Sequence, residues 1–258
     1  APLEAVARAI PAGPRDIVFR CNLVTVRDGL MHDFTAGHID QSDAAAIIAA
    51  LNAHFAADPV DFFEGVQYRH LMVLRDAGEL DCTCTPPHDI PDQPVAKYQP
   101  VGTAAGKVVA LMDRARTLLA NHPINTARLA ANKQPATDIW LWGQGRVKPL
   151  ETWQERFGLR GASIAAVDLI RGITKLLGCA QIDVPGATGF LDTNYAGKGA
   201  AAVQALDDYD VVCVHIEAPD EAGHLGDMSA KIEAIEQVDR HVVGPVLAKL
   251  RTFDKWRI

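Results

Sequence analysis

The sequence has little of what marks the specialised classes of protein. Aromatic residues make up 6% of the 258 residues, and no apolar run approaches the ~20 residues that a membrane-spanning helix needs. The first residues include Glu4 and lack a long apolar core, so we expect no secretory signal peptide. The hydrophobic share of 48% supports an extensive core, in one large domain or two ordinary ones.

Positive charge and paired cysteines are also lacking. The formal net charge is −7, with a pI near 5.7, so we expect neither nucleic acid nor a membrane as a partner. The five cysteines are odd in number and scattered, which favours reduced thiols over a disulfide framework. We therefore expect a cytoplasmic protein, in which a local arginine cluster can still bind an anionic substrate.

Hydrophobic patterning in the first part of the chain predicts a mixed α/β unit over about residues 15–150. Asp28-Gly29 is a hairpin signal between two strands, and a cappable, periodic helix follows Gly37. The chain leaves this unit through Gly143, Gly145 and Pro149. The expected strands cover residues 16–26, 66–75 and 137–145, and the expected helices cover 40–56, 103–121 and 125–133.

After residue 150 the pattern becomes an alternation of helix and strand, which implies a largely parallel sheet. Ser163 is an expected helix cap, and Gly244-Pro245 should kink or divide the last helix. The expected helices run from 163 to 177, from 193 to 209 and from 227 or 229 to about 250, with strands at 180–186 and 211–216.

A buried strand followed at once by acids and a histidine is the sharpest feature of the chain. The run from Val211 to Ile216 predicts a strand buried on both faces, and polar residues follow it. Asp220 and His224 are four residues apart, the spacing of one helical turn. Carboxylate and imidazole at the end of a parallel strand suit a divalent metal ion. The alternative is a chance pair of solvated residues.

Five polar residues in the first unit are candidates for binding. Arg20 interrupts an apolar strand, so it either pairs with an internal carboxylate or binds an anion in a cleft. Arg69 and His70 should point to opposite faces of their strand, so at most one enters a given cleft. Asp89 either orients His88 toward a substrate or caps a local turn.

Segments spread over the whole chain, in the same order, resemble the archaeal-type cofactor-independent phosphoglycerate mutases of the alkaline phosphatase superfamily. The resemblance implies an α/β fold: an incomplete alkaline-phosphatase-like parallel-sheet core with an inserted α/β substrate domain. Residues 1–14 would form the edge of the metal-binding core, 15–150 the inserted domain and 151–258 the middle of the core. The matching segments are HIEAPDEAGH, FRCNLVTV, TAGHI, YRHLMVL, TPPHDI, DIWLWGQG, RGASIAAVDLIRGI and PGATGFLDTNY.

The resemblance also implies an activity, interconversion of 2- and 3-phosphoglycerate through a phosphoserine enzyme with two divalent metal ions, Mn²⁺, Mg²⁺ or Zn²⁺. Asp220 and His224 would be ligands of one metal. The substrate, phosphoglycerate, would be held by residues drawn from Arg20, Arg69, His70, His88 and Asp89.

No catalytic nucleophile is identified in this sequence. Its three serines, Ser42, Ser163 and Ser229, each stand at an expected helix start. In the family the nucleophile and the other ligands lie in N- and C-terminal segments of the parent chain, which are missing here, so we expect the chain alone to be inactive. Two alternatives remain. One is a sister phosphotransferase, phosphatase, phosphonate hydrolase or putative homoserine kinase, and the other is a non-catalytic ligand-binding fragment.

Overall fold

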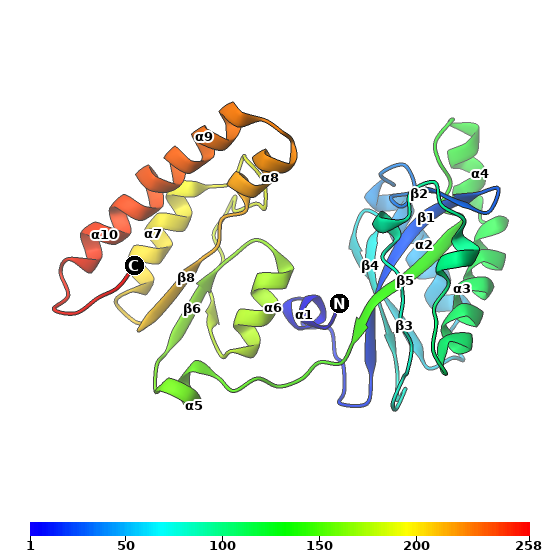
Figure 1. The fold of residues 1–258 in the computed structure, drawn as a ribbon, viewed down its shortest axis with the longest axis horizontal. Coiled ribbons are helices and arrows are strands. Elements are labelled where there is room, and N and C mark those ends of the chain that lie inside the picture. Colours follow the sequence, from blue (N-terminus) through cyan, green and yellow to red (C-terminus); the bar gives the residue numbers. More distant parts are fainter. The chain divides into compact units, whose positions relative to one another are not determined.

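The computed structural model describes all residues from 1 to 258, and the chain divides into two compact units (Figure 1). Unit 1 comprises Ala1–Ala5 and Ile10–Lys148, and unit 2 comprises Val6–Ala9 and Pro149–Ile258. The sequence patterns place a boundary near residue 150, and the chain passes between the units at residues 148 and 149. The first fourteen residues are shared between the two units, and their role as the edge of the metal-binding core and a hinge stays a prediction.

Unit 1 is built on a five-stranded antiparallel sheet around β1 (Ile17–Arg27). The strand order is β2-β1-β4-β3, and β5 also pairs with β1. Together with β1, the strands are β2 (Leu30–Asp33), β3 (Val60–Val66), β4 (Arg69–Leu74) and β5 (Asp138–Gly145). The α-helices are α1 (Pro2–Ala7), α2 (Gln41–His54), α3 (Ala105–Ala120) and α4 (Pro123–Ala130), with short 3₁₀ helices at Pro87–Asp89 and Val95–Tyr98.

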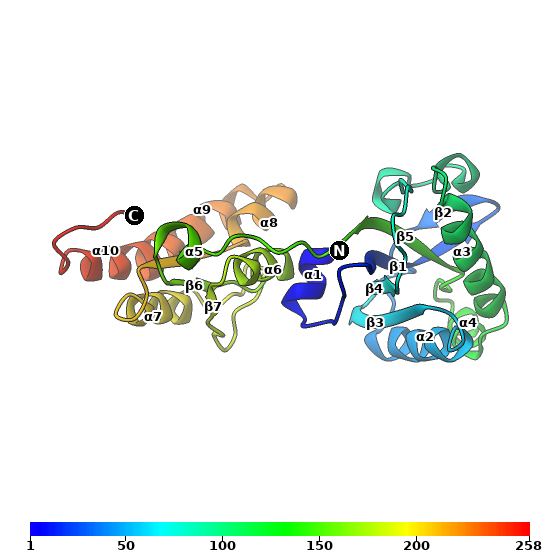
Figure 2. The same cartoon turned by 90° about the horizontal axis from the view of Figure 1, so that it is seen from below.

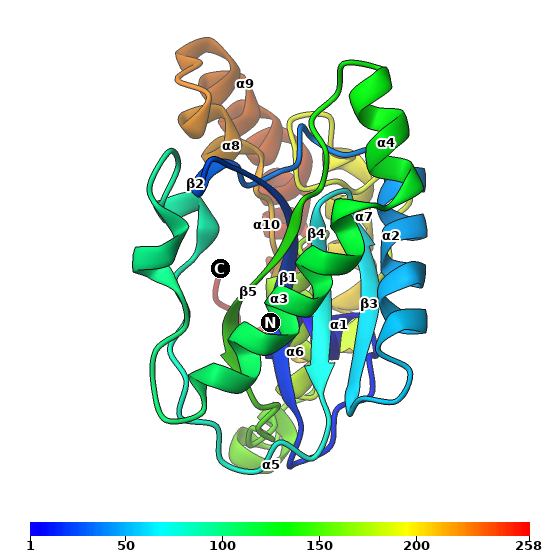
Figure 3. The ribbon, with the colours of Figure 1, turned by 90° about the vertical axis from the view of Figure 1, so that its right-hand side faces the viewer.

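The two faces of this sheet are covered differently, because successive side chains of a strand point to opposite faces. Phe19 and Cys21 of β1 belong to the large buried cluster that also contains side chains of α2 and α3. These two helices lie across one face of the sheet (Figure 3). On the other face, Val18 packs with Ala5 of α1 and Val73 of β4. Arg20 and Asn22 also lie on this second face, where they are opposite Trp142 and Trp140 of β5.

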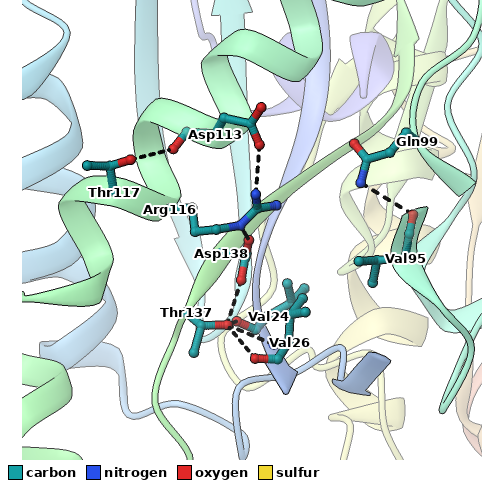
Figure 4. Close-up of polar contacts among 9 residues, drawn as sticks. All are labelled: Val24, Val26, Val95, Gln99, Asp113, Arg116, Thr117, Thr137 and Asp138. Atoms are coloured by element: carbon teal, nitrogen blue, oxygen red, sulfur yellow. Dashed lines mark hydrogen bonds and ion pairs between the residues drawn. The ribbon is translucent and has the colours of Figure 1, made fainter. Parts of the chain in front are cut away.

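An ion pair fastens α3 to the sheet (Figure 4). Arg116 of α3 donates its Nε–H to Asp138 at the start of β5, and its Nη1 bonds Asp113 at 2.7 Å. The Thr137 hydroxyl donates to the other oxygen of Asp138 at 2.6 Å. Asp138 is buried, so these donors satisfy a carboxylate that would otherwise be costly to remove from water.

Unit 2 contains a three-stranded parallel sheet in the order β7-β6-β8, with β6 (Gly161–Ile164), β7 (Ala180–Gln181) and β8 (Val211–Val214). Figure 1 shows α7 between β8 and α10, and Figure 2 shows the same elements from below. The parallel order predicted for this part of the chain is therefore confirmed. Its α-helices are α5 (Trp153–Phe157), α6 (Asp168–Leu176), α7 (Tyr195–Ala205), α8 (Ala218–His224), α9 (Met228–Val238) and α10 (Gly244–Leu250), with a π-helical turn at Asp239–Val243.

Two expectations about unit 2 are wrong. Ser163 does not begin a helix but lies in the central strand β6, and α6 starts at Asp168. The error has a physical cause, since β6 is a run of small residues whose pattern continues into the helix. β8 is not buried on both faces, because its three valines are only partly buried and Cys213 is exposed.

Other local predictions are confirmed. The return strand β2 follows the Asp28-Gly29 turn, and α10 begins at Gly244 after the π-helical turn. Asp227 caps α9, because its Oδ1 accepts a hydrogen bond from the amide of Ala230 at 2.9 Å. No helix combines the length and apolar character needed to cross a bilayer.

Candidate functional site

Asp220 and His224 lie one turn apart on α8, which begins just past the carboxyl end of β8. Asp220 Oδ2 and His224 Nε2 are 3.1 Å apart, so the two side chains face each other. Both are open to solvent, with 64% and 75% of their side chains exposed. The predicted placement on one face of a helical turn is confirmed, whereas the role as metal ligands stays a prediction.

The geometry of this pair is compatible with a shared metal ion. Oxygen and nitrogen ligands that lie roughly 2.1 Å from one ion are about 3 Å apart when the angle at the metal is close to 90°. The 3.1 Å separation fits that condition. No group of three or more His, Cys, Asp or Glu side chains in residues 1–258 converges on such a point. The pair therefore supplies two donors, fewer than the three protein ligands of a typical catalytic site.

A second acid–imidazole pair lies at the start of the same turn. His215 continues the β6–β8 ladder, since its amide donates to the carbonyl of Ile164 at 2.9 Å. His215 Nε2 is 3.0 Å from Glu217 Oε2, and both side chains are about a quarter exposed. The Glu217 carbonyl accepts the first helical hydrogen bond of α8, from the amide of Asp220 at 2.9 Å. The strand end and the candidate ligands are thus joined through consecutive backbone bonds.

Lys198 of α7 lies buried behind this strand end, with a relative exposure of 1%. Its ammonium donates to the carbonyl of His215 at 3.2 Å and to that of Thr188 at 3.4 Å. Burial lowers the pKa of Lys198, and the nearby carboxylate of Glu217 opposes that shift. The ammonium therefore connects the end of β8 with the glycine-rich loop that precedes α7.

In unit 1, three of the candidate binding residues are joined by aromatic side chains. The Arg20 guanidinium lies over the indole of Trp142 at 4.6 Å, and the His88 ring meets the same indole edge-on at 5.0 Å. The Arg69 guanidinium lies over the ring of Tyr68 at 4.6 Å. Phe34 bridges the two groups, with centroids 6.3 Å from both His88 and Tyr68. We call this set the cationic–aromatic row: Arg20, Trp142, His88, Phe34, Tyr68 and Arg69.

Strand register explains why the row forms. Arg20 and Asn22 are two residues apart on β1 and point to the same face, while Arg69 lies opposite Asn22 on β4. Trp142 of β5 donates its indole N–H to Asn22 Oδ1 at 3.0 Å. The amide of Asn22 is 4% exposed, so this hydrogen bond also satisfies a buried polar group.

Arg20 also makes the internal ion pair that was one of its two expected roles. Its Nε–H donates to Glu4 Oε2 of α1 at 2.8 Å. Burial alone would raise the pKa of Glu4, but the Arg20 hydrogen bond and the neighbouring positive charges outweigh burial and lower it. Glu4 uses only the Nε–H, so the two Nη groups of Arg20 are not committed to it. Anion binding by Arg20 stays a prediction.

His70 and Asp89 differ from the other candidates in their placement. His70 is buried, at 2% exposure, and its Nδ1 accepts a hydrogen bond from the amide of Gly65 at 3.0 Å. Gly65 lies where the pairing of β3 with β4 shifts register, so His70 supports that irregularity on the face away from Arg69. Asp89 Oδ1 is 3.7 Å from His88 Nε2, beyond a hydrogen bond. Substrate contact by either residue stays a prediction.

Sequence patterns missed Trp142, Asn22, Tyr68 and Lys198. A tryptophan in an apolar strand usually lies in the core, so the sequence does not mark Trp142 as a binding residue. The signal that could have found it is the register, which sets residue 142 beside Arg20. Lys198 gave no signal, since a lysine in a helix is normally solvated.

The fold resembles those of two solved structures. A protein from Pyrococcus horikoshii superposes with a TM-score of 0.73, covering 96% of this chain and 58% of that chain at 23% identity. The cofactor-independent phosphoglycerate mutase of Thermoplasma acidophilum superposes with a TM-score of 0.56, covering 93% and 66% at 23% identity. This chain therefore shares its fold with these two proteins.

The sequence is also similar to proteins with a named activity. The family model of 2,3-bisphosphoglycerate-independent phosphoglycerate mutase matches residues 1–125. The mutase of that name from Methanothrix thermoacetophila is 47% identical over all of this chain and 65% of its own length. A probable mutase of that name from Geobacter sulfurreducens is 44% identical, over 100% and 65%. The chain is similar to these mutases over its whole length, and it spans about 65% of the length of these relatives.

Proposed function

We propose that the protein to which this chain belongs is a phosphoglycerate mutase that interconverts 2- and 3-phosphoglycerate. The observation that carries the proposal is the 47% identity to a curated mutase, which runs through both units and therefore through both candidate sites. In this assignment unit 2 holds a metal ion, and the cationic–aromatic row of unit 1 holds the substrate.

The chemistry of the row fits an anionic substrate with a carboxylate and a phosphate. Arginine guanidinium groups bind both of these planar or multidentate anions through paired N–H donors. Arg20 is held in place by Glu4 and Trp142, and Arg69 by Tyr68, so both guanidinium groups are oriented before a ligand arrives. Prior orientation reduces the entropy lost on binding.

Asp220 and His224 would hold one divalent ion, Mn²⁺, Mg²⁺ or Zn²⁺, in unit 2. Bound metal ions in such a site stabilise charge on the transferring phosphoryl group and activate a serine hydroxyl. The serine nucleophile and the remaining ligands would come from the part of the relatives' length that this chain does not span. A cytoplasmic location is part of the same proposal.

Substrate binding by unit 1 can be tested on the chain itself. Calorimetric titration with 3-phosphoglycerate should show binding that weakens roughly tenfold or more in Arg20→Met, the loss typical of a charge-assisted hydrogen-bonded contact. Arg15→Met is the matched control, because Arg15 pairs with Asp76 at the exposed surface and should leave the affinity unchanged. Equal affinities of Arg20→Met and the unmodified chain would exclude the cationic–aromatic row as the substrate site.

Turnover tests whether this chain alone is catalytically complete. The chain alone should bind phosphoglycerate without converting it, since Asp220 and His224 are two ligands of a site that needs at least three. Measurable mutase activity of these 258 residues would contradict this expectation. No observation in the structure favours a sister phosphatase, phosphonate hydrolase or kinase over the mutase.

A further inference from the structure

The buried ammonium of Lys198 is an anomaly in unit 2. Lys198 is among the largest side chains that are less than 2% exposed in the whole chain. A buried lysine usually has a carboxylate partner, because removing an unpaired charge from water is costly. The Lys198 ammonium instead donates hydrogen bonds to two backbone carbonyls, those of Thr188 and His215.

Those two carbonyls belong to two different segments that meet at the carboxyl end of the sheet. His215 directly follows the last residue of β8, and its amide is bonded to the carbonyl of Ile164 of β6. Thr188 lies in the loop between β7 and α7, where its own amide bonds the Thr193 hydroxyl. The Lys198 ammonium therefore links the end of β8 to the loop between β7 and α7, two segments that are distant in sequence.

The strand end that Lys198 holds leads directly to the candidate metal ligands (Figure 1). His215 precedes Glu217 by two residues, and the Glu217 carbonyl starts α8. A backbone that could shift at His215 would move the start of α8, and with it the positions of Asp220 and His224. Small displacements of ligands are costly for a metal site, which needs its donors within a narrow distance range.

We propose that Lys198 is a positioning residue: its ammonium ties the carbonyl of His215 to that of Thr188 and so fixes the turn from which Asp220 and His224 project. The proposal rests on the proposed role of those two residues as metal ligands. Lys198 itself does not touch the metal or the substrate, since it is almost fully buried. Two carbonyls accept hydrogen bonds from the three N–H groups of the ammonium. Because removing the charge from water is costly, we expect these bonds to order the two segments without raising the stability of the fold.

Lys198→Met tests this, because methionine nearly preserves the length of the side chain and removes the charge. We expect amide hydrogen exchange in peptides covering 185–193 and 214–224 to become roughly tenfold faster, as both lose a charge-assisted hydrogen bond. Exchange in unit 1 should not change, and the midpoint of thermal unfolding should stay or rise, since a costly buried charge has been removed. Lys175→Met, at an exposed lysine of α6, is the matched control.

Faster exchange throughout unit 2 together with a lower unfolding midpoint would overturn the proposal, because it would make Lys198 a general stabilising residue. Unchanged exchange in both segments would overturn it as well. If Lys198→Met does not fold, NMR of the unmodified chain decides. Through-hydrogen-bond couplings from the Lys198 ¹⁵Nζ to the carbonyl carbons of Thr188 and His215 are expected, and their absence from a resolved Nζ signal contradicts the proposal.

These results are independent of metal binding. If Asp220→Asn leaves Mn²⁺ binding unchanged while Lys198→Met loosens both segments, the metal assignment fails and the positioning of the turn stands. If Asp220→Asn abolishes Mn²⁺ binding while Lys198→Met changes no exchange rate, the metal assignment stands and the positioning role fails.

Discussion

The two units of this chain bury different kinds of side chain. In unit 1 the buried cluster contains large residues such as Phe19, Phe55 and Trp140. In unit 2 the buried apolar residues are mostly alanines, while large apolar side chains such as Ile232, Ile235 and Met228 are more than half exposed. Apolar burial is the main stabilising contribution to a fold. Unit 1 is therefore expected to be the more stable unit, because unit 2 has a smaller apolar core.

The largest effect expected from this difference is at Trp140. Its side chain is 1% exposed, and its indole N–H donates to the carbonyl of Thr85 at 2.8 Å. Trp140→Ala should lower the free energy of unfolding of unit 1 by about 3–5 kcal/mol, measured by urea denaturation. Leu225→Ala, at a leucine of unit 2 that is 61% exposed, should change stability by less than about 0.5 kcal/mol. Similar losses of unfolding free energy in Trp140→Ala and Leu225→Ala would contradict the difference between the two units.

The two units also differ in how their buried cations are paired. Arg128 of unit 1 is 3% exposed and bonds Asp43 at 2.8 Å as well as the carbonyls of Gln134 and Ala36. Arg128→Met should destabilise unit 1 by about 3 kcal/mol, at the low end for a broken buried pair because Asp43 keeps some solvent contact. Lys198→Met should not destabilise unit 2. Urea denaturation of both variants checks this, and equal losses would contradict it.

A smaller effect is expected at Trp142, where the fold and the candidate site of unit 1 meet. Trp142→Phe keeps an aromatic ring beneath Arg20 but removes the hydrogen bond to Asn22. We expect 3-phosphoglycerate affinity to fall by about 1 kcal/mol, close to fivefold, in calorimetry. Trp153→Phe in unit 2 is the control. If both variants bind like the unmodified chain, Trp142 does not position the arginine.

The smallest expected effect is the response of unit 1 to acid through Asp16. Burial would raise the pKa of Asp16, but hydrogen bonds from the amides of Asp76 and Gly13 and from Arg75 outweigh burial and lower it below the ordinary 3.8. The stabilisation is therefore complete above the ordinary pKa and is lost as the pH falls through the lowered value. Asp16→Asn should flatten the loss of stability of unit 1 below about pH 4.

Urea denaturation between pH 5 and pH 2 measures this response. Asp254→Asn, at an exposed position near the C-terminus, is the control and should follow the unmodified chain. A steeper loss of stability in Asp16→Asn than in the unmodified chain would reverse the assigned sign.

The sequence predicts this structure best where a local pattern determines the result. The Asp28-Gly29 hairpin, the division at Gly244 and the facing of Asp220 and His224 all depend on residues close in the chain. It fails where distant segments decide. β6 was mistaken for the start of a helix because only its pairing with β7 and β8 makes Ser163 part of a strand.

The candidate sites follow the same rule. Arg20 and Arg69 were found because charge stands out in a strand, and His88 was found because Asp89 follows it at an expected turn. The side chains that join them were not, since Trp142 reaches Arg20 only through the register of β5 against β1. The burial of Lys198 likewise depends on the loop around Thr188 and on the end of β8, both remote in sequence.

The central claim is that Asp220 and His224 hold a metal ion together, and a Mn²⁺ titration followed by NMR tests it most directly, because paramagnetic broadening detects even weak binding. The imidazole signal of His224 and the amide signals of residues 220–224 should broaden first and selectively, and Asp220→Asn should remove that selectivity. Broadening centred elsewhere in the chain, or unchanged in Asp220→Asn, would contradict the claim.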